Sequence, residues 1–243
     1  MHKHTSRPIS VRSGLNTAFQ QTLPIILGYV PVGFAYGVLA QKSGLSGINT
    51  VLMSILVFAG SGQLIAVGLF AGLASPLTIV MTTFIVNLRH LLMSAALAPY
   101  LNSWSKTRLA LFAAQMTDET FALHAGRFAR GEHKHEHGCT ETFGINVIAH
   151  SAWVGGTALG LAASTLITDI KPIGLDYALA AMFIALLIGQ SKTRVHVLVG
   201  IVAGALSTVL LQAGLTQAHV LAATIISATF GLGVLVWTSK RSS

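Results

Sequence analysis

Long apolar stretches separated by short polar segments run through the whole sequence. They predict transmembrane helices, because about 20 apolar residues are needed to cross a hydrocarbon core about 30 Å thick. The apolar residues are continuous and do not alternate with period two, which favours helices over strands. We expect eight spans, in the order Leu15–Ala40, Ile48–Gly72, Leu77–Pro99, Leu109–Arg130, Thr142–Ile167, Tyr177–Gln190, Val195–Gln212 and Ala218–Trp237. The sixth has only about 14 residues, so seven spans are the alternative.

The composition points to the same class of protein. Of the 243 residues, 53% are hydrophobic and only 9% are charged, against about 25% charged residues in a soluble domain. The mean hydropathy is +0.70. The sequence therefore predicts an all-α, polytopic helical membrane protein with broken helices. We expect residues 1–14 to form a cytoplasmic arm, 15–238 the transmembrane domain and 239–243 a cytoplasmic tail.

The basic residues indicate how the chain is oriented in the lipid bilayer. The net charge of +8 comes from residues near loop ends and not from a basic stripe with interleaved aromatic residues, so nucleic acid is not an expected partner. With both termini in the cytoplasm, only Lys42, Lys106, Arg108 and Lys171 lie outside. The inner set is Lys3, Arg7, Arg12, Arg127, Arg130, Lys134, Lys192, Arg194, Lys240 and Arg241. This asymmetry favours cytoplasmic N- and C-termini.

Two predicted spans contain residues that interrupt helices. Pro24 and the segment Gly28–Gly33 interrupt the first span, and Gly60-Ser61-Gly62-Gln63 lies in the middle of the second. Each has two interpretations: close helix packing through small residues or a proline kink, or an unwound segment that lines a site. Small residues four apart occur at Gly33/Gly37, Gly68/Gly72, Gly156/Gly160 and Gly200/Gly204.

The third span carries an arginine in an apolar frame, in the sequence Asn87-Leu88-Arg89-His90. An arginine at the centre of a bilayer costs about 2.5–3.5 kcal/mol on insertion scales, so it needs a partner or a function. Asp118 and Glu119 of the fourth span are the natural partners. Adjacent helical residues point about 100° apart, so one arginine can hardly serve both acids. We expect the other acid to face a cavity and exchange protons; the alternative is an ion pair that only fixes helix packing.

These polar groups match the needs of a zwitterionic substrate. Its carboxylate requires a cation or a helix N-terminus, and its ammonium group requires an acid or carbonyl oxygens. An apolar cavity would suit an aliphatic side chain. The candidate substrate-binding or coupling residues are Arg89, Asp118, Glu119, Asn87, His90, Gln63, Ser61, Gly60, Gly62, Tyr29 and Pro31.

The histidine-rich loop Glu132–Cys139 resembles a metal-binding tract only in composition. Its alternating histidines lack the spacing of a helical zinc site, so we expect a solvated loop and no metal site. Cys139 is the only cysteine, which excludes an internal disulfide. No phosphate-binding loop, dinucleotide fingerprint or nucleophile elbow is present, so we expect neither a cofactor nor an enzyme.

Four motifs in the first half of the chain resemble the AzlC family. They are Leu23–Gly37, Phe58–Gln63, Asn87–His90 and Thr117–Ala122, in that order and spacing. The resemblance implies a permease of the bacterial inner membrane that exports valine, leucine and isoleucine, with methionine as a further candidate. It also implies a small AzlD-like membrane subunit and export driven by the proton motive force. Some relatives carry Asp where this chain has Asn87.

The function predicted from the residues and the resemblance together is the large subunit of a secondary transporter for apolar amino acids. Arg89 would bind the substrate carboxylate or lock the resting state, and Asp118 or Glu119 would bind protons or the ammonium group. Gly28–Gly33 and Gly60–Gln63 would form a cradle of broken helices. The alternatives are a channel-like pore, in which Gly60-Ser61-Gly62 is a carbonyl filter, and a membrane scaffold that transports nothing.

Overall fold

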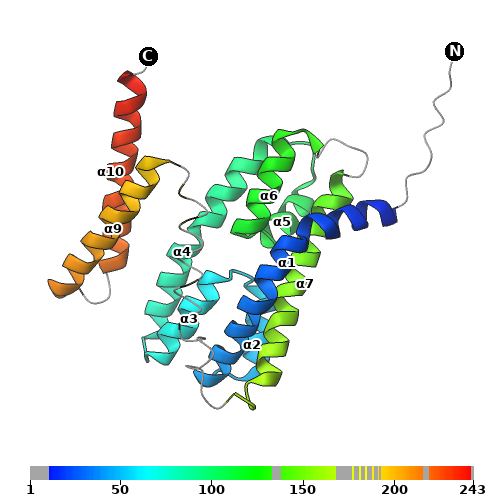
Figure 1. The fold of residues 1–243 in the computed structure, drawn as a ribbon, viewed down its shortest axis with the longest axis horizontal. Helices are drawn as coiled ribbons and strands as arrows, with labels where there is room; N and C mark the ends of the chain where they lie inside the picture. Colours follow the sequence, from blue (N-terminus) through cyan, green and yellow to red (C-terminus); the bar gives the residue numbers. More distant parts are fainter. Residues whose placement is uncertain are drawn as a thin grey trace. The chain divides into compact units, whose positions relative to one another are not determined.

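The computed structural model describes residues 11–132, 138–167, 177, 181, 184, 188, 191, 193–215 and 219–241. The chain divides into two compact units, Met1–Leu179 and Ala180–Ser243, and each is described by itself. The secondary structure within the described residues is helical throughout (Figure 1). The sixth predicted span and most of the histidine-rich loop lie outside the described residues.

The first unit contains seven α-helices and a short 3₁₀ helix among its described residues. They are α1 (Val11–Lys42), α2 (Gly47–Leu56), α3 (Ser61–Ala71), α4 (Pro76–Leu97), η1 (Ala98–Tyr100), α5 (Lys106–Ala114), α6 (Asp118–Ala129) and α7 (Gly138–Ala163). The second unit contains α9 (Arg194–Gln212) and α10 (His219–Arg241). They form an antiparallel pair, in which Ser207 of α9 bonds His219 of α10 and Gly231 faces Val199.

Four described helices are long and apolar enough to cross a membrane: Ser13–Lys42, Pro76–Tyr100, Gly138–Ala163 and Arg194–Gln212. Shorter apolar helices are Gly47–Leu56, Ser61–Ala71 and Ala222–Trp237. This confirms the prediction of an all-α membrane protein. The described helices follow the predicted spans in order, with two spans each divided into two half-helices.

The distribution of side chains is the reverse of that in a soluble protein. Large apolar residues of α4 are exposed along one face at helical spacing, namely Leu77, Val80, Phe84, Leu88 and Leu91. Threonine, serine, asparagine, histidine and arginine side chains are instead fully buried between the helices. Such a molecule is stable where its surface contacts lipid and its polar groups find partners inside.

Helices α1 and α7 pack closely along their length. A methyl group added to Gly156 or Gly160 would lie closer than 3.0 Å to backbone atoms of Val30 or Phe34 in α1, and one added to Gly37 would meet Thr157 in α7. The two predicted glycine pairs at 33/37 and 156/160 thus face each other, as close helix packing in membranes requires. Gly68 and Gly204 belong to the other two pairs. A methyl group added to either would have no atom within 4 Å, so close helix packing does not account for them.

The expected break in the first helix is wrong. Helix α1 is continuous for 32 residues, with Pro24 and Pro31 inside it. A proline removes one backbone donor, but neighbouring helices and local adjustments let membrane helices tolerate this. Gly28 is exposed and has no neighbouring atom within 4 Å of an added methyl group, while Gly33 touches α7. Neither glycine of this segment unwinds the helix, and only Gly33 serves its packing against α7.

The break in the second span is confirmed, and a second break occurs where none was predicted. Helix α2 ends at Leu56 and α3 begins at Ser61, with Phe58 and Gly60 at positive φ angles of 42° and 46°. The fourth span is likewise divided between Ala114 and Asp118 into α5 and α6. Each half-helix has 9–12 residues, about half the length needed to cross a membrane.

Candidate functional site

The N-terminus of α6 places two acidic residues in the middle of the fourth span. Thr117 caps the helix: its hydroxyl accepts from the backbone N–H of Thr120, and the Thr120 hydroxyl accepts from the N–H of Thr117. This reciprocal capping satisfies two backbone donors and fixes where the helix begins. Asp118 and Glu119 occupy the first turn, where the helix dipole stabilises negative charge.

The N-terminus of α3 is built differently. Gly60 takes the N-cap position without a side-chain cap, and no acidic residue lies in the first turn. Gln63 holds the break together, since its amide accepts from the N–H of Ala59 at 3.3 Å and donates to Ser54 Oγ of α2 at 3.2 Å. The α3 N-terminus therefore keeps its partial positive charge.

Arg89 of α4 connects these two half-helices. Its Nη1 lies 2.6 Å from Oδ2 of Asp118, the first residue of α6. Its Nη2 donates to Oγ of Ser61, the first residue of α3, at 2.5 Å and to the carbonyl oxygen of Ala59 at 3.5 Å. The Arg89 and Asp118 side chains are 25% and 15% exposed. One guanidinium thus bonds the first residue of both half-helices.

Glu119 has a different partner. The hydroxyl of Tyr29 in α1 lies 2.7 Å from Glu119 Oε2 and 2.5 Å from Thr117 Oγ1. The prediction that Arg89 serves only one acid is confirmed. The expectation that the other acid is unpaired is wrong, because Tyr29 reaches Glu119 from a helix 90 residues earlier in the chain.

Aromatic rings enclose Tyr29 beside the break between α2 and α3. The Tyr29 ring packs edge-on against Phe58, with centroids 6.2 Å apart, and against Trp153 of α7, at 5.6 Å. Trp153 also stacks on Tyr36, and His150 stacks on Phe58 at 4.1 Å. Phe58 thus holds its unusual backbone conformation between rings from α1 and α7.

The structure separates the predicted site residues into two groups. Arg89, Asp118, Ser61, Tyr29 and Glu119 lie in the bonded cluster described above. Asn87 contacts Gly62, where an added methyl group would lie 2.9 Å from its Oδ1.

Two further predicted residues, His90 and Pro31, lie outside this bonded cluster. His90 Nε2 is buried without a hydrogen-bond partner among the residues that the structure describes. Pro31 is exposed on α1, because the helix continues through it and directs its ring outward.

Sequence reasoning missed the role of Thr117 and the nearness of Trp153. A signal for the first was present: a threonine followed by two acidic residues and a second threonine is typical of a helix N-terminus. It predicts the division of the fourth span, which hydropathy alone conceals. The sequence offered no comparable signal for Trp153, since α1 and α7 are distant in the chain.

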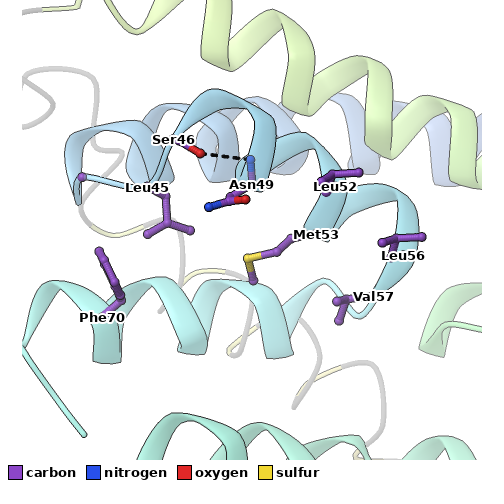
Figure 2. Close-up of a pocket in the computed structure, with 9 residues that line it drawn as sticks. Leu45, Ser46, Asn49, Leu52, Met53, Leu56, Val57 and Phe70 are labelled. Carbon is purple, nitrogen blue, oxygen red and sulfur yellow. Dashed lines mark hydrogen bonds between the residues drawn. The ribbon is translucent and has the colours of Figure 1, made fainter. Parts of the chain in front are cut away.

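A groove of about 560 Å³ lies on another part of the first unit, between α2 and α3. Leu45, Met53 and Phe70 extend between the two helices, and Ser46 caps α2 by accepting from the N–H of Asn49 (Figure 2). Its lining contains neither Arg89 nor Asp118, so the groove is separate from the ionic cluster.

A second ionic cluster lies at the other end of α6. Arg127, which is fully buried, bonds Glu132 at 3.1 Å and also pairs with Glu141 of α7. Arg130 bonds the other oxygen of Glu132 at 2.6 Å. The hydrogen bond from Arg130, with Arg127 close by, holds the pKa of the Glu132 carboxyl below its usual range. Among the described residues, no group of three histidine, cysteine or acidic side chains is arranged to hold a metal.

Comparison with known proteins identifies the family. Residues 24–167, more than half of the chain, match the family model described as AzlC protein. An uncharacterized membrane protein of Archaeoglobus fulgidus is 34% identical over 223 residues, which is 90% of this chain and 93% of that protein. No solved structure matches.

Two further relatives carry more informative names. The branched-chain amino acid transport protein AzlC of Bacillus subtilis is 27% identical over 81% of this chain and 76% of its own length. The inner membrane protein YgaZ of Escherichia coli is 28% identical over 84% of this chain and 86% of its own length. The matched region 24–167 contains the whole cluster from Tyr29 to Trp153. The chain belongs to the AzlC family of membrane proteins, and this membership supports a role as a transporter.

Proposed function

We propose that this chain is the large subunit of a secondary transporter that exports branched-chain amino acids in exchange for protons. Valine, leucine and isoleucine are the principal substrates, with methionine as a further candidate. The name of the Bacillus subtilis relative, a branched-chain amino acid transport protein, supports the substrate class. The protein works in the bacterial inner membrane with both termini in the cytoplasm, and it is completed by a small AzlD-like membrane subunit.

The observation that carries this proposal is the contact of Arg89 with the first residues of α3 and α6. Half-helices that begin inside the membrane are typical of substrate sites in transporters. An arginine can bind a carboxylate through two parallel hydrogen bonds. The carboxylate of an amino acid can therefore replace Asp118 on Arg89, next to the uncapped N-terminus of α3.

The same exchange provides a site for the ammonium group. When the substrate carboxylate occupies Arg89, Asp118 is released and lies one residue from Glu119 on the first turn of α6. Two carboxylates in this position attract either an ammonium group or a proton. Substrate and proton then compete for the same acids, which is the requirement for exchange of one against the other.

The decisive experiment measures efflux of labelled valine from loaded vesicles under an imposed proton gradient, with and without the small subunit and an uncoupler. We expect saturable efflux that the gradient accelerates and the uncoupler returns to its gradient-free rate, and loss of that acceleration in Asp118→Asn and Glu119→Gln. Efflux indifferent to these substitutions and to the uncoupler would contradict proton coupling. A pore predicts non-saturating conductance instead.

The variant Arg89→Ala separates transport from a scaffold role. Transport predicts that the variant reaches the membrane in normal amounts but moves no valine. A scaffold predicts that the substitution lowers only folding and abundance, because the unmodified protein itself moves no valine. Thr83→Ala, on the same helix and bonded only within it, is the matched control and should transport normally.

A further inference from the structure

One face of α6 carries a buried polar stripe that the proposed substrate site does not use. Thr117, Thr120, His124 and Arg127 follow one another at intervals of three and four residues, so they share one face of the helix. Thr117 is 6% exposed and the other three are fully buried. Burying polar groups away from water is costly unless they are bonded, and in membrane segments such groups mark ion or proton routes.

The stripe begins at Glu119 with a chain of hydroxyl groups. The Tyr29 hydroxyl lies 2.7 Å from Glu119 Oε2 and 2.5 Å from Thr117 Oγ1. Thr117 Oγ1 lies 3.1 Å from Thr120 Oγ1. Each hydroxyl can accept one hydrogen bond while it donates another, so the three groups can pass a proton along the chain.

His124 lies one turn beyond Thr120, on the same face of the helix. Its Nε2 lies 2.8 Å from Oδ1 of Asn146 in α7. Because a carbonyl oxygen only accepts, Nε2 carries the hydrogen and Nδ1 presents a lone pair. This Nδ1 is buried and has no hydrogen-bond partner in the part of the chain that the structure describes. The ring lies between Phe112 and Phe128, with centroids 5.2 and 5.5 Å away.

The stripe ends at charged groups that reach the surface. Arg127 bonds Glu132 and Glu141, whose side chains are 25% and 18% exposed. Arg127 keeps its charge at all accessible pH values, so it orders the acids without relaying protons itself. Glu141 of α7 can. The charged groups around His124 are thus Arg127 on its own helix, Glu141 on α7 and Glu132 with Arg130 in the following turn, while α5 contributes the uncharged ring of Phe112.

We propose that this stripe is the proton route between Glu119 and the surface at Glu141, with His124 as the relay. The inference rests on the proposed function and adds the path followed by the protons that are exchanged for the amino acid. One proton enters at Glu119, moves through the hydroxyls of Tyr29, Thr117 and Thr120, crosses one turn of α6 through internal water, and binds His124 at Nδ1. His124 then releases one proton to Glu141 through internal water, which commonly satisfies buried polar atoms of this kind. Glu141, whose side chain is 18% exposed, then releases the proton to bulk water, so each group ends in its starting protonation state.

The alternative explanation for His124 is helix packing, because its bond to Asn146 joins α6 to α7. The variant His124→Gln separates the two explanations. Its amide can still bond Asn146, but it cannot bind a proton in the physiological range. Two assays on reconstituted protein are compared: valine counterflow, which needs no net proton movement, and valine transport driven by a pH gradient.

We expect His124→Gln to keep counterflow near the level of the unmodified protein. Gradient-driven transport should fall by on the order of a hundredfold, the size typical of losing a positioned proton-transfer group. His219→Gln is the matched control, since His219 also makes one hydrogen bond, to Ser207, and it should preserve both activities. Equal gradient-driven transport in His124→Gln and the unmodified protein would refute the relay, and so would loss of both activities at normal abundance.

A second pair of variants tests the route without altering His124. Glu141→Gln keeps an oxygen that can accept from Arg127 but cannot carry a proton, and Glu141→Asp keeps the carboxyl group. Only the glutamine variant should lose gradient-driven transport while it retains counterflow; equal behaviour of the pair would refute the route. If the unmodified protein shows no valine counterflow, the proposed function is wrong and the relay with it. If counterflow is present but the variants behave alike, only the relay is wrong.

Discussion

Tyr29 is the side chain through which α1 reaches the ionic cluster. Its hydroxyl bonds Glu119 and Thr117 of the fourth span, and its ring packs against Phe58 and Trp153. A single residue thus joins the acids at the N-terminus of α6 to the break between α2 and α3. Movement of either half-helix must change the environment of this hydroxyl.

Replacement of Tyr29 by phenylalanine tests this role, because it removes the hydroxyl and keeps the ring. A hydrogen bond to a charged group contributes about 1.5–3 kcal/mol, so valine efflux should fall by roughly tenfold to a hundredfold. Tyr36→Phe is the control, because its hydroxyl bonds uncharged groups, the Thr50 carbonyl oxygen at 3.3 Å and the Gln63 side chain. Equal efflux in the two variants, at equal abundance, would contradict a role for the Tyr29 hydroxyl.

For single residues, the sequence predicts which side chains need a bonding partner more reliably than it predicts which partner each of them has. The scarcity of charge inside the membrane reduced the choice for Arg89 to Asp118 or Glu119. Hydropathy gave no means of assigning Tyr29 to Glu119, because the pair depends on which faces of two distant helices meet. The sequence therefore predicts that Arg89 pairs with one of the two acids, but it does not predict the bond between Tyr29 and Glu119.

Among the elements, the helices follow the predicted spans because the bilayer fixes their length and forces their backbone groups to bond internally. The interruptions were harder to predict. Gly60 unwinds the chain, whereas Gly28 and Gly33 lie in a continuous helix. Glycine permits both outcomes, and the contact with α7 decides between them for α1.

Gly155 and Gly156 provide an internal comparison for the packing of α1 and α7. A methyl group on Gly156 would lie 2.6 Å from the carbonyl oxygen of Val30, while one on Gly155 meets nothing within 4 Å. Gly156→Ala should destabilise the protein by about 1–3 kcal/mol, as overpacking typically does. Gly155→Ala should be neutral or slightly stabilising, because alanine favours helix. Thermal unfolding in detergent measures both, and equal melting temperatures would contradict the close packing.

For the whole molecule, the direction of the helices agrees with the predicted order of spans. Helices α1 and α7 run parallel, since Gly144 lies beside Ala18 and Gly160 beside Phe34. Parallel packing is what the first and fifth of a series of alternating spans must show. Counting α2 with α3 and α5 with α6 as one span each gives α7 this fifth place.

Labelling with a membrane-impermeant thiol reagent tests the orientation. The native Cys139 lies in the first turn of α7, on the side assigned to the cytoplasm, so it should react in inside-out vesicles and not in right-side-out vesicles. In a chain carrying Cys139→Ser and Ser103→Cys, the new thiol lies in the exposed turn before α5 and should show the opposite pattern. Reaction of both thiols from the same side would contradict the assigned orientation.

The packing of α1 against α7 also constrains how the protein is made. Tyr29 enters the membrane early in synthesis, but Trp153 and the glycines that α1 packs against emerge more than a hundred residues later. Until then the first span lacks its contacts with α7 and remains in the membrane mainly because it is hydrophobic. The cluster around Tyr29 and Glu119 is therefore completed by the arrival of the fifth span, and chains that end before α7 should insert without acquiring a protease-resistant core.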